Sequence, residues 1–308
     1  MSKGLTDAKF VVDFQAQRHW DWKVAFYLYG AGTSAGLIFL ELVLQRLSVV
    51  DEKTALWGMW IGLVLVSISL LFLFAHLGPG ARWRFVLVFR RPRTSWIARG
   101  AIIVTVLVFF RIMLLLPSVP GFQELPWGEG TISGSVLRAG VLIFAAAFMA
   151  YSGLVLSSWN SVAFWNTPLL PILYIGYSFL GGMAALPIIV LALGGEAGLE
   201  VVGPVFWLSL LILLSANGFI LLLYLWGMST GTLPARESVR RLVRGQHRWS
   251  FWAGTVGIGL VIPTILAALV VGGGLGLGAA VVACAAVQVG CFLLRDNILR
   301  VGVYGYPI

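Results

Sequence analysis

Residues 55–75 read ALWGMWIGLVLVSISLLFLFA, a run of apolar and small residues without a charge. A helix on the surface of a soluble protein has one polar face, whereas this run is apolar on every face. About 20 such residues in a helix cross the hydrocarbon core of a bilayer, which is roughly 30 Å thick. The stretch therefore predicts a transmembrane helix.

Windows of the same kind recur on both sides of this stretch. They cover residues 22–44, 96–116, 139–159, 169–193, 205–226, 251–271 and 275–294. These runs lack the apolar–polar alternation of a transmembrane β-barrel. We expect an all-α integral membrane protein with about eight transmembrane helices, which form a single membrane domain over residues 1–308.

The composition excludes other classes of protein. Of 308 residues, 59% are hydrophobic and 11% are charged, and the mean hydropathy is +0.95. A soluble domain is about 45–50% apolar and about 25% charged, and a disordered chain is poorer still in apolar residues. No cleavable signal peptide is expected, because the first apolar run is too long for a signal h-region.

The layout indicates an internal duplication. Helices one to four and five to eight each have a basic loop between their second and third members. Helices one and five each have small residues that allow close helix packing: Gly30, Gly32, Ser34, Ala35 and Gly36 in one, and Gly176, Gly181, Gly182 and Ala184 in the other. This pattern predicts two four-helix bundles, over residues 1–160 and 161–308.

The net charge of +9 is divided unevenly between the membrane faces. The side that holds both termini receives seventeen basic and five acidic residues, against four and seven on the other side. Because Lys and Arg collect in cytoplasmic loops, both termini are predicted to be cytoplasmic. One interpretation is that these basic side chains set the topology and contact lipid headgroups. Another is that they dock an acidic soluble subunit. Either accounts for the basic charge, and no nucleic-acid partner is expected. The arginines assigned to docking are Arg82, Arg84, Arg90, Arg91, Arg93, Arg240, Arg241 and Arg244.

The sequence is poor in residues that hold metals or redox centres. His19 and His76 lie at the same membrane face but outside the spans, which favours interfacial hydrogen bonding over haem ligation. Cys284 and Cys291 are too few for an iron–sulfur cluster, which takes four thiolates or close equivalents. We expect no metal or haem in this chain.

Glu41 and Arg111 are ionisable side chains inside predicted spans, where such residues are functional candidates. Both lie near the end of their helix on the acidic side. One interpretation is an ion pair or proton-relay element; snorkelling to the nearby interface is the other, and it is favoured. Tyr151 is also distinctive, because Ser152 and Gly153 follow it and are expected to open space beside its hydroxyl.

Short motifs follow one another along the sequence in a specific order: Trp20-x-Trp22 with Gly30-x-Gly32-Thr33-Ser34-Ala35-Gly36, His76-Leu77-Gly78-Pro79, Pro92-x-Thr94-Ser95-Trp96-Ile97-x-Arg99-Gly100-Ala101, Tyr151-Ser152-Gly153, Trp165-Asn166-Thr167-Pro168 and Ile298-Leu299-Arg300-x-Gly302. Together they resemble the polysulfide reductase membrane-subunit family (NrfD type). The resemblance covers nearly the whole sequence. It implies two four-helix bundles and a location in the cytoplasmic (inner) membrane of a bacterium or archaeon.

The resemblance also implies a function. Members of this family bind a quinone, menaquinone or ubiquinone, near the face where a four-cluster, ferredoxin-like iron–sulfur subunit docks beside a molybdopterin catalytic subunit. The protein would then be the membrane anchor of a respiratory complex. It would exchange electrons between the partner's clusters and quinone or quinol, without a catalytic centre of its own.

Site residues follow from the matching motifs. Tyr151 matches the family's quinone contact. The start of the first helix supplies another contact in the family, often Asn or His, but Val24 occupies one such position here. The quinone-binding residues expected in this protein are therefore Tyr151, Asp21, Trp22, Lys23 and Tyr27. The residues expected to handle protons are His19, His76, Glu41 and Arg111.

Two other functions are compatible with eight helices. A secondary transporter would have broken helices around a polar site at the membrane midplane, whereas Glu41 and Arg111 lie off centre. A purely structural anchor would bind no quinone, and the hydroxyl and imidazole groups at the basic side argue against it.

Overall fold

The computed structural model describes residues 14–48, 50, 52–82, 84–90, 92–128, 130–199 and 204–305. Eight membrane-length helical spans lie within these residues, which confirms the all-α fold and the predicted number of spans. They are α1 (Trp22–Arg46), α2 (Glu52–His76), α4 (Trp96–Leu115), α5 (Ile132–Ser157), α6 (Leu169–Leu199), α7 (Pro204–Thr230), η3 (Ser250–Val261) continued by α9 (Ile262–Val271), and α10 (Leu277–Arg300).

Short elements occupy the connections between the spans. α3 (Gly78–Arg82) and η1 (Phe85–Arg90) follow α2, η2 (Leu116–Ser118) ends α4, and α8 (Leu233–Val243) follows α7. η3 is a π-helix, which sequence periodicity did not predict. α8 is amphipathic, because its basic side chains point outward while Ala235, Ser238 and Leu242 are buried.

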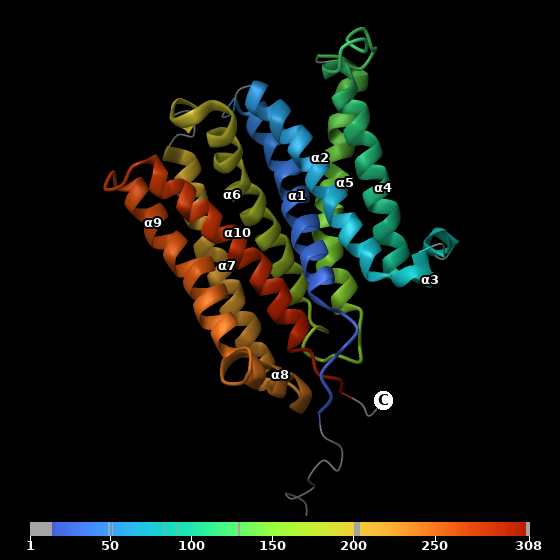
Figure 1. The fold of residues 1–308 in the computed structure, drawn as a ribbon, viewed down its shortest axis with the longest axis vertical. Coiled ribbons are helices and arrows are strands. Elements are labelled where there is room, and N and C mark those ends of the chain that lie inside the picture. Colours follow the sequence, from blue (N-terminus) through green and yellow to red (C-terminus); the bar gives the residue numbers. More distant parts are fainter. Residues whose placement is uncertain are drawn as a thin grey trace, which may run out of the picture.

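α1 lies at the centre of the fold (Figure 1). It contacts α2, α5, α6 and α10, while α4 packs on α5 and α7 packs on α6 and α9. α1 is accordingly the most buried of the described spans. The arrangement explains why its sequence is rich in small residues, since four neighbours must approach one helix closely.

Two glycines bring α1 and α6 into backbone contact. A Cβ built on Gly36 would overlap the carbonyl group of Ser178, and one on Gly182 would overlap the backbone of Gly36 and Leu37. The two small-residue tracks found in the sequence therefore meet each other. The grouping of the helices into two bundles, over residues 1–160 and 161–308, stays a prediction.

We expect Gly36→Ala to destabilise the protein by about 1–3 kcal/mol, because the added methyl group must displace the α6 backbone. Unfolding of the purified protein in detergent measures this change. Gly218→Ala in α7 is the matched control, since a Cβ there meets nothing within 4 Å. Equal stability of the Gly36→Ala variant and the wild-type protein would contradict the close contact.

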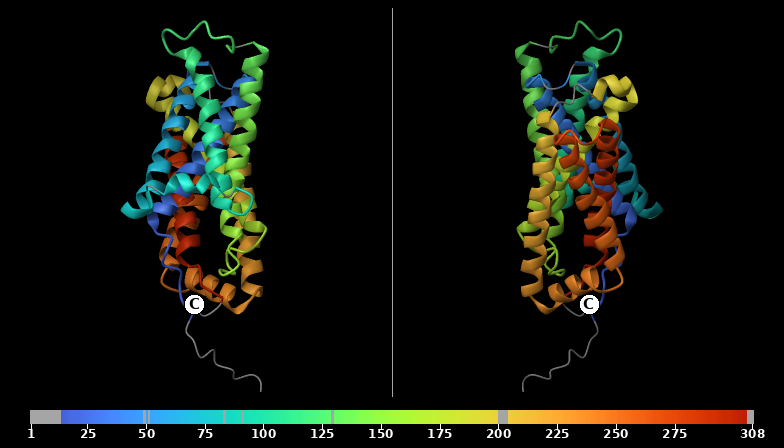
Figure 2. Two further views of the ribbon diagram at one scale, coloured as in Figure 1. Left: turned by 90° about the vertical axis from the view of Figure 1, so that its right-hand side faces the viewer. Right: turned by 90° about the vertical axis from the view of Figure 1, so that its left-hand side faces the viewer.

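The two ends of the helices differ in charge, as the sequence predicts. Figure 2 shows α8 and the last described residues of the sequence at one end of the helices, and the connection before α5 at the opposite end. The first end, here called the basic end, also holds the start of α1, the 77–95 connection and the end of α10. Which end faces the cytoplasm stays a prediction.

Several predicted boundaries are wrong, and two of them affect the description of polar side chains. The fourth span begins at Ile132 and not at Ala139, because the Thr131 hydroxyl caps the helix by accepting a hydrogen bond from the Gly134 N–H. The last span continues to Arg300 instead of ending at Leu294. Arg295, which directly follows the predicted end of this span, therefore lies inside it and is fully buried.

Candidate functional site

Two of the predicted site residues, Tyr27 and Tyr151, meet between α1 and α5. Both side chains are buried, at 5% exposure each. Their hydroxyl groups are close enough for a side-chain hydrogen bond. Tyr27 is about 9 Å from Asp21 along the axis of α1, at a rise of about 1.5 Å per residue. The pair thus lies about two turns below the basic end.

The ring of Tyr151 is fixed by its neighbours. It stacks on Phe148, with centroids 6.0 Å apart and an interplanar angle of 7°. On the α4 side a Cβ built on Gly100 would overlap the Tyr151 ring, so a glycine is required there. Gly153 does not open space beside the hydroxyl as the sequence predicts, because it packs against the backbone of Pro171 in α6.

Asp21 and His76 form a second pair, at the basic ends of α1 and α2. Asp21 Oδ1 lies 3.2 Å from His76 Nδ1. The same oxygen caps α1 by accepting hydrogen bonds from the backbone N–H groups of Lys23 and Val24, at 3.0 and 3.4 Å. Both side chains are partly exposed, so water can reach the pair.

Two predicted residues do not join this site. Trp22 is 48% exposed and makes an edge contact with Phe72 on the outer surface of α2, with ring centroids 5.9 Å apart. This position suits a membrane-interface tryptophan. His19 is exposed on the segment before α1.

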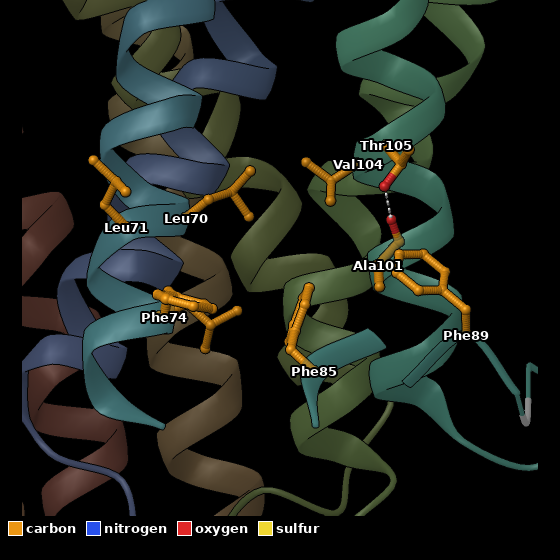
Figure 3. Close-up of a pocket in the computed structure, with 9 residues that line it drawn as sticks. Leu70, Leu71, Phe74, Phe85, Phe89, Ala101, Val104 and Thr105 are labelled. Atoms are coloured by element: carbon orange, nitrogen blue, oxygen red, sulfur yellow. Dashed lines mark hydrogen bonds between the residues drawn. The ribbon is translucent and has the colours of Figure 1, made fainter. Parts of the chain in front are cut away.

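An apolar groove of about 380 Å³ opens between α2, η1 and α4. Figure 3 shows the side chains of α2 on one side, Phe85 of η1 at the bottom, and α4 on the other side. Phe74 and Phe85 meet edge to face, with centroids 6.3 Å apart. The groove is lined by Leu70, Leu71, Leu73, Phe74, Phe85, Phe89, Ala101, Val104 and Thr105.

Residues near both polar pairs line the groove, although none of the four paired side chains is part of its lining. Ala101 lines it and directly follows Gly100, which touches Tyr151. Phe74 lines its other wall, one half-turn before His76. Sequence reasoning missed the groove and Gly100. The adjacent small residues Gly100 and Ala101 on α4 indicate a close helix contact, but the sequence does not identify the helix that α4 contacts.

Glu41 and Arg111 form a buried ion pair far from this site, toward the opposite end of the helices. Glu41 Oε1 and Arg111 Nη1 are 2.6 Å apart and both side chains are fully buried. Gly58 of α2 leaves room for the pair, since a Cβ there would lie 2.9 Å from Glu41 Oε2. The favoured prediction of snorkelling is wrong, because α2 covers both groups.

The arginines assigned to docking lie at the basic end, apart from Arg91, which is outside the described residues. Arg90 and Arg93 border a surface hollow of about 500 Å³. Glu237 binds both Arg240 and Arg241, at 2.6 and 2.8 Å, and these hydrogen bonds hold the pKa of its carboxyl group below the usual value. Arg241 also donates to the Phe14 carbonyl, whereas Arg240 is 65% exposed.

Groups of three or more side chains that could bind a metal are absent from the described part of the protein. Cys284 and Cys291 are both buried free thiols.

Comparison with known proteins places this arrangement in a family. The family described as "Polysulphide reductase, NrfD" matches residues 11–304. The chain belongs to the NrfD polysulphide reductase family. Two of its relatives are Protein NrfD of Escherichia coli, with 28% identity over 92% of this sequence and 94% of the relative, and a polysulfide reductase subunit of Wolinella succinogenes, with 25% identity over 80% and 82%.

Membership of the NrfD family agrees with the resemblance found in the sequence motifs. The match extends across all eight spans, so it includes both tyrosines of the buried pair, the Asp21–His76 pair and the groove.

Proposed function

We propose that this protein is the membrane subunit of a respiratory oxidoreductase and exchanges electrons between a partner subunit and membrane quinone. The observation that carries the proposal is the apolar groove, whose α4 wall includes Ala101, the residue after the Gly100 that packs on Tyr151. The name of the W. succinogenes relative, a subunit of polysulfide reductase, supports a role within a complex.

The residues present fit a quinone. Its isoprenoid tail needs an apolar channel from the bilayer, which the groove supplies. A quinone carbonyl oxygen needs a hydrogen-bond donor, and the hydrogen-bonded Tyr27–Tyr151 pair keeps one hydroxyl proton free to donate. A quinone supplies two-electron, two-proton redox chemistry when bound.

The protein's own part in that chemistry is to orient and to transfer protons. Tyr151 would donate a hydrogen bond to a quinone oxygen, with Tyr27 fixing the direction of its hydroxyl. The Asp21–His76 pair would exchange protons with water at the basic end. Lys23 lies in the first turn of α1 beside this pair and would add positive charge. Proton handling by His19, Glu41 and Arg111 stays a prediction.

The electrons must come from another subunit. We propose a four-cluster iron–sulfur subunit, linked to a molybdopterin subunit, that docks on the basic end through acidic side chains. Exposed arginines such as Arg240 and the rim of the Arg90–Arg93 hollow provide complementary charge. Orientation of this end toward the cytoplasm of a bacterial or archaeal cell follows from the positive-inside rule.

Blocking the groove tests the proposal. We expect Thr105→Phe to weaken binding of a fluorescent quinol analogue with an alkyl tail by about tenfold, because excluding about two methylene groups costs about 0.8 kcal/mol each. Thr105 is exposed in the groove, so the fold is retained. Titration of the purified protein in lipid nanodiscs measures the affinity.

A second apolar hollow supplies the matched control. Val136 is 61% exposed and lines a hollow beside Phe109 and Trp127 at the other end of α4. Val136→Phe should leave the affinity unchanged, and a tailless analogue should bind Thr105→Phe normally. Absence of binding to the wild-type protein would favour a structural anchor and overturn the proposal.

A further inference from the structure

Arg295 of α10 is a fully buried cation within the membrane-spanning part of the protein. Its Nη1 donates to the Cys291 carbonyl at 2.9 Å, and its Nη2 donates to Ser178 Oγ at 3.3 Å. Its Cζ lies 5.4 Å from the centroid of the Tyr174 ring. Its Nε has no hydrogen-bond partner in the described part of the protein. The guanidinium group is therefore held from two sides but is not fully satisfied.

No carboxylate neutralises this charge within the described residues, because none of the ion pairs there includes Arg295. The neighbouring Asp296 binds Arg300 instead, at 2.7 Å. The Cys291 thiol donates to the Tyr177 carbonyl at 3.6 Å, so it keeps its proton and is not a counter-ion. An uncompensated buried charge is strongly unfavourable in a membrane, which indicates a missing anion.

The surroundings of Arg295 also hold hydroxyl groups that could donate to an anion. Tyr174, Tyr177 and Ser178 share one face of α6 by their spacing. Among the described residues, the buried hydroxyl groups of Tyr174 and Tyr177 find no partner, and neither does Arg295 Nε. Tyr174 contacts Arg295 through its ring, and the Tyr177 carbonyl accepts from Cys291, one turn before Arg295 on α10.

The absence of a side chain at Gly32 lets the guanidinium group pack directly against α1. A Cβ built on Gly32 would lie 2.5 Å from Arg295 Nη2 and 2.6 Å from Ser178 Oγ. By contrast, the nearby polar groups of the same interface are satisfied, since Tyr29 donates to Gln288 and Gln288 donates to the Gly181 carbonyl.

Water could bond to these groups, because a hydroxyl accepts as well as donates, but water would leave the Arg295 charge uncompensated. An anion accepts their hydrogen bonds and also neutralises the charge. We propose that Arg295, with the hydroxyl groups of Tyr174 and Tyr177, forms a buried site for a small monovalent anion of the halide class between α1, α6 and α10. This site is independent of the proposed quinone site, which lies on the α5 side of α1.

Halide-dependent stability tests this site. The purified full-length protein is unfolded thermally in gluconate buffer while bromide or chloride replaces gluconate at constant ionic strength. The thermal unfolding midpoint of the wild-type protein should rise with halide concentration, because a ligand that binds only the folded state stabilises it. Arg295→Gln should abolish the dependence, and Arg295→Lys should raise the half-saturating concentration at least tenfold.

Arg300→Gln is the control, because it removes an arginine from the exposed end of the same helix and should keep the wild-type dependence. If Arg295→Gln does not fold, Tyr177→Phe removes one donor and retains the ring, and it should raise the half-saturating concentration several-fold. Bromide anomalous density beside Arg295 would give direct support. A wild-type midpoint insensitive to halide, or a halide dependence that persists in Arg295→Gln and in Tyr177→Phe, would overturn the proposal.

Discussion

We expect Tyr151→Phe to lower quinol-dependent electron transfer by about 100-fold in membranes that contain the assembled complex. The phenol is the hydrogen-bond donor that faces Tyr27 in the buried pair, and loss of a positioned donor or proton-transfer group typically costs on the order of 10²-fold in rate. The ring itself remains, so its stacking on Phe148 and its fit against Gly100 are retained. The rate is measured per assembled complex, after quantifying the protein in the membrane.

Tyr224→Phe is the matched control for this prediction. Tyr224 is also a fully buried tyrosine, but its hydroxyl donates to the Phe164 carbonyl between α7 and the segment before α6. Its loss should lower stability by about 1 kcal/mol, the net contribution of one hydrogen bond, and leave the rate per complex unchanged. Full activity in Tyr151→Phe would show that the Tyr151 hydroxyl is not part of the quinone site. The role of the groove is tested separately by the Thr105→Phe titration.

The spans could be predicted from the sequence because lipid imposes a simple rule. Every backbone polar group in the bilayer must be paired within a helix, so uniformly apolar runs become helices. Their ends are less predictable. One span begins at Ile132, seven residues before the start that the sequence predicts. Ser133, Ser135 and Arg138 lower the hydropathy of this first part of the helix.

The polar pairs were only partly predictable. Tyr27 and Tyr151 could be named from motif and depth, and the structure brings them together. The groove could not be predicted, because it depends on how far α2 stands from α4. Arg295 was misplaced for a related reason: its position near a helix end is typical of a snorkelling residue, but α1 and α6 enclose it.

Glu41 and Arg111 show the same limit of sequence reasoning. Their depth in the membrane was evident from the sequence, but the direction of each side chain around its helix was not. That direction decides between an exposed charge at the interface and a buried pair. The structure gives a pair 2.6 Å apart with both side chains fully buried, so the energetic consequence of breaking it is large.

We therefore expect Glu41→Gln to destabilise the protein by about 3–5 kcal/mol, because it leaves the Arg111 guanidinium buried without a counter-charge. Arg111→Met should cost a similar amount by leaving the carboxylate alone. The double variant Glu41→Met with Arg111→Met should recover most of that loss, since a well-packed apolar pair of similar volume is often as stable as a buried ion pair. Unfolding free energies in detergent measure all three.

A surface pair calibrates the comparison. Glu237→Gln breaks the ion pairs with Arg240 and Arg241 on α8, which lie at the basic end and are partly solvated, so its cost should stay within about 1 kcal/mol. A Glu41→Gln cost as small as this would contradict a buried, charged pair. Failure of the double methionine variant to recover stability would instead indicate that the charges themselves are needed between α1, α2 and α4, as the proton-relay interpretation requires.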